Sequence, residues 1–330
     1  MKVVVFSARP YDHKFLDQAN KAANHQLTYC EARLSLQTAS LCQGADAVCA
    51  FINDDLSQPM LSAIAEMGVR FIALRCAGYN NVDLPFAQAQ NIPIVRVPAY
   101  SPYAVAEHTT ALILALNRKI YRAYNRVRED NFLLDGLLGF DLHGSTVGIV
   151  GTGKIGQCFA QIMAGFGCNL LAYDLHQNPD CLKLGVRYVE LNELIASSRV
   201  ISLHCPLLPD TYHLINAEAI ALMQPGTMLI NTSRGGLVDT EAAIAGIKSG
   251  QIGALGIDVY EQEADLFFTD QSNAIIQDDT FQLLQSFPNV VITAHQAFFT
   301  QNALENIAQT TLSNLDDLEA GRPCKNQVNG

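Results

Sequence analysis

Short apolar runs alternate with amphipathic stretches along the first hundred residues of the chain. A short apolar run is typical of a buried strand, and apolar residues spaced three or four positions apart are typical of one helix face. Strands are expected at 3–6, 27–30, 47–51, 71–75 and 94–97, and helices at 15–23, 59–67 and 83–90. Because this alternation is typical of a parallel sheet covered by helices on both faces, the pattern predicts an α/β fold.

The pattern changes near residue 98. Pro98, Ser101 and Pro102 make this stretch rich in turn residues, and Ser101 can cap a helix that has Pro102 at its first position. We expect that helix to extend over 102–128. A second series of strands is expected at 147–150, 170–173, 200–204, 228–231, 255–259 and 290–293, and a last helix at 300–319. Two such series in 330 residues predict two domains.

A glycine-rich turn follows the first strand of the second series. Residues 151–156 read Gly151-Thr152-Gly153-Lys154-Ile155-Gly156, between a strand pattern and an amphipathic helix pattern. In that context the spacing G-x-G-x-x-G is typical of a dinucleotide site, because the glycines let the backbone approach a pyrophosphate at the start of the helix. The alternative is that 151–156 is only a turn.

Asp174 ends the next strand pattern, near the spacing of about 20 residues at which such sites place an acid on the ribose. A carboxylate there accepts hydrogen bonds from the ribose hydroxyls and repels a 2′-phosphate, so NAD is favoured over NADP. The alternative is that Asp174 only caps a helix.

Three candidate catalytic residues follow the last three predicted strands. Arg234 follows 228–231, Glu263 follows 255–259, and His295 follows 290–293. Arginine can bind a carboxylate and polarise a ketone, histidine can exchange a proton near neutral pH, and a neighbouring carboxylate can stabilise the imidazolium. Ligands of open α/β sheets gather at the carboxyl ends of strands, so the three side chains are expected to meet. Taken singly, each could instead be an ordinary surface or packed residue.

The composition narrows the classes of partner. Hydrophobic residues make up 49% of the chain, a composition typical of globular proteins. The net charge of −11 argues against a general nucleic-acid binder. The apolar start is too short for a secretion signal, and no run approaches the about 18 apolar residues of a membrane span. Nine cysteines without a pairing motif indicate reduced thiols in a cytoplasm. Histidines and cysteines show no metal-ligand spacing, so no metal site is predicted.

The motifs together resemble one family. Residues 151–156 with Asp174, and the segments 231–235, 258–263 and 293–296, are similar to the signatures of the D-isomer-specific 2-hydroxyacid dehydrogenases. The segments 96–102, 106–108, 201–206 and 267–279 are closer to the fermentative D-lactate dehydrogenases of bacteria. The resemblance covers nearly the whole chain.

The resemblance implies a domain arrangement. A Rossmann-type NAD domain, residues 100–298, is expected to be inserted into a flavodoxin-like parallel-sheet substrate domain formed by residues 1–99 and 299–330. In the family the long helix that starts near 102 packs against a second subunit, so a homodimer or homotetramer is expected.

The resemblance also implies residue roles. Arg234 would bind the carboxylate and carbonyl of the substrate, His295 would be the acid/base, and Glu263 would be its partner. Besides Gly151, Gly153, Gly156 and Arg234, the NAD site would be lined by Lys154, Ile155, Asp174, Cys205, Pro206, Thr211, Thr232, Ser233 and Asp258. Besides Arg234 and His295, the substrate would meet Ala77, Gly78, Tyr100, Phe298 and Phe299. Thr211 and Ala294 depart from the family, which more often has Asn and Gly there.

The expected activity is that of a D-lactate dehydrogenase, which reduces pyruvate to D-lactate with NADH in a reversible reaction. One alternative is a D-2-hydroxyacid dehydrogenase for a bulkier 2-oxo acid, because Tyr100 and Phe298 or Phe299 would set the pocket size. A remote alternative is a non-catalytic interaction protein that senses NAD.

Overall fold

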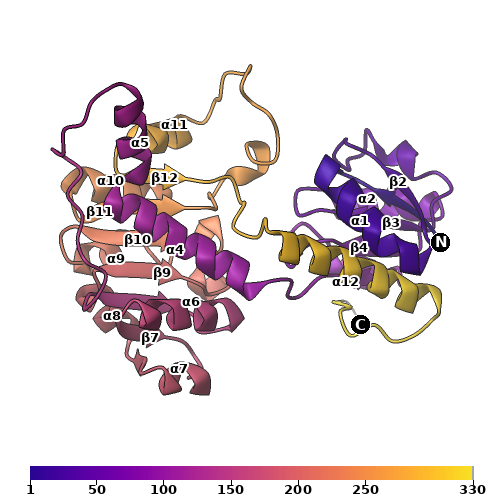
Figure 1. Ribbon diagram of the computed structural model, residues 1–330. Coiled ribbons are helices and arrows are strands. Elements are labelled where there is room, and N and C mark those ends of the chain that lie inside the picture. The colour runs from indigo at the N-terminus through magenta and orange to yellow at the C-terminus, as the bar shows by residue number, and fades with distance from the viewer. Residues whose placement is uncertain (329–330) are drawn as a thin grey trace. The chain divides into compact units, whose positions relative to one another are not determined.

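The computed structural model describes residues 1–328 and contains two compact units (Figure 1). The first unit combines residues 1–101 with the C-terminal segment from Phe299, and the second is Pro102–Phe298. The elements of the first unit are β1 (Lys2–Val5), α1 (Pro10–Ala23), β2 (Gln26–Tyr29), η1 (Ala39–Cys42), β3 (Ala47–Ala50), α2 (Gln58–Glu66), β4 (Phe71–Leu74), α3 (Leu84–Ala89), β5 (Ile94–Val95) and α12 (Gln301–Glu319).

The first unit is built on a five-stranded parallel sheet with the order β2-β1-β3-β4-β5. This is the order of flavodoxin-like sheets. The C-terminal helix α12 lies beside α1, so the end of the chain completes the unit that the first hundred residues begin (Figure 1). An isolated antiparallel bridge between Val95 and Gln327 adds the tail to the edge at β5.

The second unit contains the rest of the elements. They are α4 (Pro102–Arg118), α5 (Ile120–Arg128), β6 (Thr146–Val150), α6 (Lys154–Gly165), β7 (Asn169–Tyr173), α7 (Pro179–Lys183), β8 (Arg187–Tyr188), α8 (Leu191–Ser197), β9 (Val200–Leu203), η2 (Pro209–Thr211), α9 (Ala217–Leu222), β10 (Thr227–Asn231), η3 (Gly235–Leu237), α10 (Thr240–Ser249), β11 (Ile252–Ile257), η4 (Glu263–Asp265), α11 (Asp279–Ser286) and β12 (Val290–Ile292).

The seven strands of the second unit form one parallel sheet with the order β12-β11-β10-β9-β6-β7-β8. From β8 to β11 this is the doubly wound order of dinucleotide-binding sheets, and the strand order reverses between β6 and β9. The predicted α/β fold with two parallel sheets is therefore confirmed.

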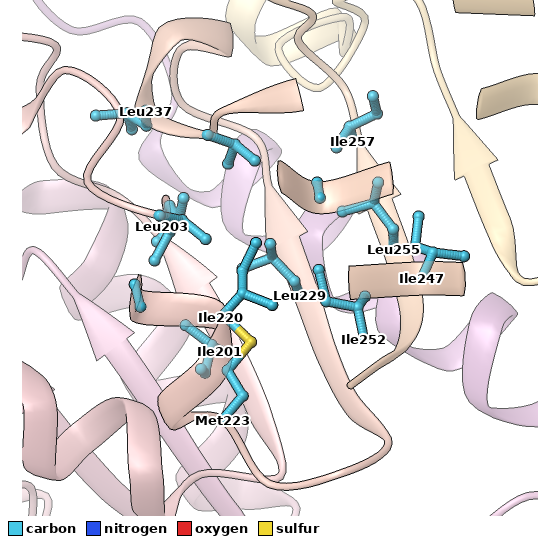
Figure 2. Close-up of a cluster of buried hydrophobic side chains, with 14 of the residues drawn as sticks. Ile201, Leu203, Ile220, Met223, Leu229, Leu237, Ile247, Ile252, Leu255 and Ile257 are labelled. Atoms are coloured by element: carbon cyan, nitrogen blue, oxygen red, sulfur yellow. The ribbon is translucent and has the colours of Figure 1, made fainter. Parts of the chain in front are cut away.

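Apolar side chains cover both faces of this sheet, because alternate residues of a strand point to opposite sides. Leu229 of β10 packs with Ile220 of α9 and Ile247 of α10 in a buried cluster (Figure 2). Its neighbour Ile230 belongs to a second cluster, with Leu116 of α4 and residues of α6. Burying one such side chain stabilises the fold by about 1.5–3 kcal/mol, so both layers of helices are fixed on the sheet.

The helix predicted at 102–128 is two helices, and this part of the prediction was wrong. Lys119 stands between α4 and α5 with a left-handed backbone, φ 50°. The side chain of Asn117 accepts a hydrogen bond from the N–H of Phe140 at 2.8 Å and donates to its carbonyl at 2.7 Å. A Cβ on Gly139 would lie 2.6 Å from the Asn117 carbonyl oxygen. Residues 139–140 thus pack against the C-terminal end of α4. They occupy the space that a continuous helix over 102–128 would need.

No helix within residues 1–328 has the length and apolar character needed to cross a membrane.

Candidate active site

The last three strands of the second sheet bring the predicted catalytic residues to one edge. In the parallel register, Asn231 at the end of β10 is paired with Ile257 of β11, and Ile257 is paired with Ile292 of β12. Arg234, Glu263 and His295 follow these three strand ends within a few residues. The carboxyl ends of adjacent parallel strands lie side by side, so the fold gathers the turns that carry all three.

His295 and Glu263 form a direct pair. The Nδ1 atom of His295 lies 2.7 Å from Oε1 of Glu263, and the two side chains are 20% and 23% exposed. The second carboxylate oxygen of Glu263 accepts a hydrogen bond from the N–H of Tyr260 at 2.9 Å. Because Nδ1 faces the carboxylate, the other ring nitrogen, Nε2, is the one that could exchange a proton with a substrate.

The turn that carries His295 is organised by Asp258, which is fully buried. Its carbonyl oxygen accepts a hydrogen bond from the His295 N–H at 2.7 Å, and its carboxylate accepts from the N–H groups of Gln296 at 2.9 Å and Ala297 at 2.8 Å. Burial raises the pKa of Asp258, against the opposing effect of these hydrogen bonds. Asp258 thus supports the His295 turn, and its predicted contact with NAD stays a prediction.

Two residues that pack behind this turn, Thr293 and His108, were not among the predicted site residues. The Thr293 hydroxyl donates to Oδ1 of Asp258 at 2.5 Å and lies 3.0 Å from Nε2 of His108. His108 belongs to α4, in the segment 106–108 that carries part of the family resemblance. The sequence did not predict that His108 lies near Asp258, because the two residues are far apart along the chain. Only the packing of α4 on the sheet brings them together.

Arg234 sits in a tight turn after β10. Its Nη1 donates to the carbonyl oxygen of Ser233 at 2.7 Å, and the Asn231 side chain donates to the Arg234 carbonyl at 2.8 Å. The backbone of Gly235 packs tightly against the loop after β11. A Cβ on Gly235 would lie only 2.2 Å from the carbonyl carbon of Tyr260. The turn of Arg234 therefore rests on the loop that leads to Glu263.

The glycine turn after β6 has the geometry that a pyrophosphate site requires. Gly151 has a φ of 93°, and a Cβ on Gly156 would lie 2.0 Å from the Gly151 carbonyl oxygen. A Cβ on Gly153 would meet no heavy atom within 4 Å, and Gly153 and Lys154 are exposed at the start of α6. The half-buried Ile155 follows in the first turn of the helix. The turn is tightly packed at Gly151 and Gly156, and it is accessible at Gly153, where a phosphate would approach the helix N-terminus. The residues therefore fit NAD.

Asp174 follows β7 beside this turn. Its carboxylate accepts hydrogen bonds from the N–H of Thr152 at 2.6 Å and of His176 at 3.1 Å. Burial acts to raise the pKa of Asp174, but these hydrogen bonds outweigh it and the pKa is lowered. The next helix, α7, is capped by Asn178, so Asp174 is not its cap. An ionised carboxylate at this place fits the ribose of NAD.

Three further predicted NAD residues, Cys205, Thr232 and Ser233, lie around the same strand ends. A Cβ on Gly151 would lie 2.6 Å from the N atom of Cys205, and the Ser233 hydroxyl donates to the Cys205 carbonyl at 2.7 Å. Burial raises the pKa of the Cys205 thiol to about 11, so it is uncharged near neutral pH. Thr232 is buried, with its hydroxyl 2.8 Å from that of Thr109. The turns after β6, β9 and β10 thus meet.

Thr211 and Pro206 form a small turn after β9. The Thr211 hydroxyl donates to the Pro206 carbonyl at 2.7 Å and accepts from the Leu208 N–H at 2.7 Å. The hydroxyl is therefore engaged in holding its own turn, and its predicted contact with NAD stays a prediction.

The predicted substrate residues of the first unit are held by their neighbours. Arg96 donates from Nη1 to the Ala77 carbonyl at 2.7 Å, and the Cys76 thiol contacts the Gly78 carbonyl at 3.2 Å. The Tyr100 carbonyl accepts from Asn306, and the Phe299 ring lies edge-on to Tyr11 at 4.8 Å. Phe298 is the last residue of the second unit and is half-buried. Their role as a pocket stays a prediction.

One group in the first unit has side chains close enough to hold a metal ion, where the sequence predicted none. Ligand atoms of His25, Asp316 and Glu319 lie within 4.8 Å of one another. The Met1 ammonium lies 2.8 Å from Glu319 Oε1 and 3.3 Å from His25 Nδ1. We interpret the group as part of a polar contact that ties the N-terminus to α12 through the ion pair of Met1 and Glu319. Sequence spacing gave no sign of it, because His25 is far along the chain from Asp316 and Glu319.

Comparison with known proteins identifies the family. The family model described as D-isomer specific 2-hydroxyacid dehydrogenase, NAD binding domain, matches residues 110–297. The chain is 53% identical to a 2-hydroxyacid dehydrogenase homolog of Haemophilus influenzae, over 99% of each chain. It belongs to the D-isomer specific 2-hydroxyacid dehydrogenase family. The family resemblance in the sequence is confirmed, and the protein is an NAD-dependent oxidoreductase.

Two further relatives show how far the likeness extends within this dehydrogenase family. The D-lactate dehydrogenase of Escherichia coli is 51% identical over 99% of this chain and 100% of that protein. A solved structure described as the pyruvate reductase of Chlamydomonas reinhardtii has a TM-score of 0.94 at 44% identity, and covers 99% of this chain and 98% of that chain.

Proposed function

We propose that this protein is a D-lactate dehydrogenase that reduces pyruvate to D-lactate with NADH, and that the reaction is reversible. The observation that carries the proposal is the 2.7 Å pair of His295 and Glu263 on the sheet edge that also carries Arg234. The relative in E. coli, named D-lactate dehydrogenase, supports the choice of substrate.

In this proposal Arg234 binds the carboxylate of pyruvate and polarises its ketone. The guanidinium is planar and permanently charged, so it can form two parallel hydrogen bonds to a carboxylate. The same charge stabilises the negative oxygen that develops as the ketone is reduced. Ala77, Gly78, Tyr100, Phe298 and Phe299 remain the predicted contacts of the rest of the substrate.

His295 donates the proton. When bound, NADH supplies the hydride that adds to the ketone carbon. His295, as imidazolium, gives its Nε2 proton to the ketone oxygen, which becomes the hydroxyl of lactate. Glu263 stabilises the imidazolium and fixes the ring by its contact with Nδ1. In the reverse direction the neutral imidazole takes the proton back.

The proposed NAD site is the turn of Gly151, Gly153 and Gly156. The N–H groups at the start of α6 would hold the pyrophosphate, and Asp174 would accept hydrogen bonds from the ribose hydroxyls. The other predicted contacts are Lys154, Ile155, Cys205, Pro206, Thr211, Thr232, Ser233 and Asp258.

We also propose that the protein is a homo-oligomer. Large apolar side chains are exposed on α5 and the segment after it, and a second copy of the chain is the partner that we expect to cover them. They are Ile120, Tyr124, Val127, Phe132, Leu133, Leu134 and Leu138.

The experiment that tests the function follows NADH absorbance with pyruvate as substrate, and then determines which enantiomer of lactate has formed. The proposal predicts turnover and D-lactate. A higher kcat/KM for phenylpyruvate or a branched 2-oxo acid would favour the dehydrogenase for a bulkier substrate. Tight NADH binding without turnover of any 2-oxo acid would favour the remaining alternative, a non-catalytic interaction protein that senses NAD.

A further inference from the structure

A second histidine–carboxylate pair lies on the same edge of the second sheet. Nε2 of His213 is 2.6 Å from Oε1 of Glu261, and the side chains are 28% and 24% exposed. Oε1 of Glu261 also accepts from the Tyr212 hydroxyl at 3.2 Å, and its Oε2 accepts from the Thr240 hydroxyl at 3.0 Å. Glu261 is therefore held from three sides, more than a solvated surface carboxylate needs.

His213 is tied to the chain that follows Arg234. Its N–H donates to the Gly236 carbonyl at 2.8 Å, and the N–H of Ile215 donates to the Leu237 carbonyl at 3.0 Å. His213 has a left-handed backbone, φ 51°, which is costly for a residue other than glycine and persists where its surroundings fix it. Its Nδ1 also faces Asp239, with Oδ2 at 3.9 Å.

Glu261 belongs to the loop that leads to the catalytic candidates. The Arg234 turn rests on this loop, because a Cβ on Gly235 would lie 2.4 Å from the N atom of Glu261. Two residues further on, Glu263 accepts from the Tyr260 N–H and pairs with His295. One short loop therefore carries a carboxylate that pairs with His213, whose N–H binds the Gly236 carbonyl after Arg234, and a second carboxylate that pairs with His295.

We infer that His213 and Glu261 are a positioning pair that fixes the Arg234 turn relative to Glu263 and His295. The inference rests on the proposed function, in which Arg234 binds the carboxylate of the substrate. The pair does not touch the reacting atoms. It sets how far the group that binds the substrate lies from the group that supplies the proton, and reaction rates are sensitive to such distances.

The test compares Glu261→Ala with Glu261→Gln. Since a misplacement of about 1 Å can cost about 100-fold in rate, we expect Glu261→Ala to raise the KM for pyruvate about tenfold or more, with a smaller fall in kcat. The Kd for NADH and the Tm should stay close to those of the unmodified protein. In Glu261→Gln the amide oxygen can take the place of Oε1, where it accepts from Tyr212 and faces His213, and the amide NH2 can donate to the Thr240 hydroxyl. This variant should therefore restore most of the KM.

Glu193→Ala is the matched control. Glu193 forms an exposed ion pair with Arg187 at 3.1 Å in the same unit, so this variant should keep the KM of the unmodified protein. A KM for Glu261→Ala equal to that of the control would overturn the positioning role. An equal loss of NADH binding and Tm in Glu261→Ala and Glu261→Gln would also overturn it, because it would indicate general destabilisation.

A double-mutant cycle with Arg234→Lys decides whether the pair acts through Arg234. We expect the KM effect of Glu261→Ala to shrink to about threefold or less in the Arg234→Lys background, because residues that act together are not additive. If the KM of the double variant equals the product of the two single effects, the two residues act independently and the inference is contradicted. Turnover of pyruvate by the unmodified protein with no effect of Glu261→Ala would overturn this inference alone, whereas no turnover of any 2-oxo acid would overturn the proposed function with it.

Discussion

At the scale of single residues, His295 is placed by backbone contacts as much as by its side chain. Its φ of 51° is in the left-handed region, which costs about 1–3 kcal/mol for such a residue. The carbonyl of Asp258 holds its N–H at 2.7 Å, and the Asp258 carboxylate holds the next two N–H groups. Strain of this kind is concentrated at functional sites, which agrees with the proposed role of His295.

The guanidinium of Arg234 gives the first prediction. Arg234→Lys keeps the charge and loses the planar fork, so the bidentate contact with the substrate carboxylate is lost. We expect kcat/KM for pyruvate to fall about 10- to 100-fold, mainly through KM, since a hydrogen bond to a charged group contributes about 1.5–3 kcal/mol. Steady-state kinetics measure this, and an unchanged KM and kcat would exclude Arg234 from substrate binding.

Asp174 gives a prediction about the choice of cofactor. Its lowered pKa means that the carboxylate is charged throughout the neutral range, where it repels a 2′-phosphate. Asp174→Ala should raise the KM for NADH and lower the preference for NADH over NADPH by about tenfold, equivalent to about 1.4 kcal/mol. Kinetics with both cofactors check it, and an unaltered preference would contradict a contact with the ribose.

At the scale of elements, the start of α6 depends on two glycines for different reasons. A Cβ at Gly156 collides with the Gly151 carbonyl, whereas a Cβ at Gly153 meets nothing within 4 Å. Gly156→Ala should therefore lower both the Tm and the affinity for NADH. Gly153→Ala should leave the Tm nearly unchanged and weaken NADH, because its methyl group enters the space of the phosphates.

Thermal unfolding and NADH titration separate the two glycine variants. Gly165→Ala is the control, because it lies at the end of the same helix with open space around it and should bind NADH normally. Normal NADH affinity in Gly153→Ala would contradict a pyrophosphate site at this turn.

The elements also show what the sequence could and could not predict. Apolar periodicity located the strands of both sheets except β8 (Arg187–Tyr188), because a buried strand has a local signature, whereas a two-residue edge strand has none. It did not reveal the break at Lys119, since that break depends on Asn117 binding Phe140, which follows 23 residues later in the chain. The support of His295 by Asp258, Thr293 and His108 was hidden for the same reason: contacts across long stretches of chain leave no local pattern.

At the scale of the whole molecule, the exposed apolar segment after α5 predicts assembly. Leu134 is 80% exposed, and Phe132, Leu133 and Leu138 are exposed close by. We expect the unmodified protein to have at least the mass of a dimer by light scattering, and Leu134→Glu to shift it toward the monomer. Leu36→Glu, at an exposed leucine in the first unit, should leave the mass unchanged. A monomeric unmodified protein would contradict the proposal.

The family and the catalytic candidates could be predicted from the sequence because their motifs follow strand ends, and a parallel sheet brings strand ends together. The second pair, His213 with Glu261, could not be predicted in this way. Its members belong to two different loops, and only their 2.6 Å contact reveals that they are partners.

The most direct test of the account is the turnover of pyruvate by His295→Ala, measured beside the affinity of the same variant for NADH. We expect kcat to fall by about 100- to 10,000-fold, because general acid–base catalysis contributes about that much, while the Kd for NADH stays unchanged. Turnover close to that of the unmodified protein would contradict the assignment of His295 as the group that delivers the proton.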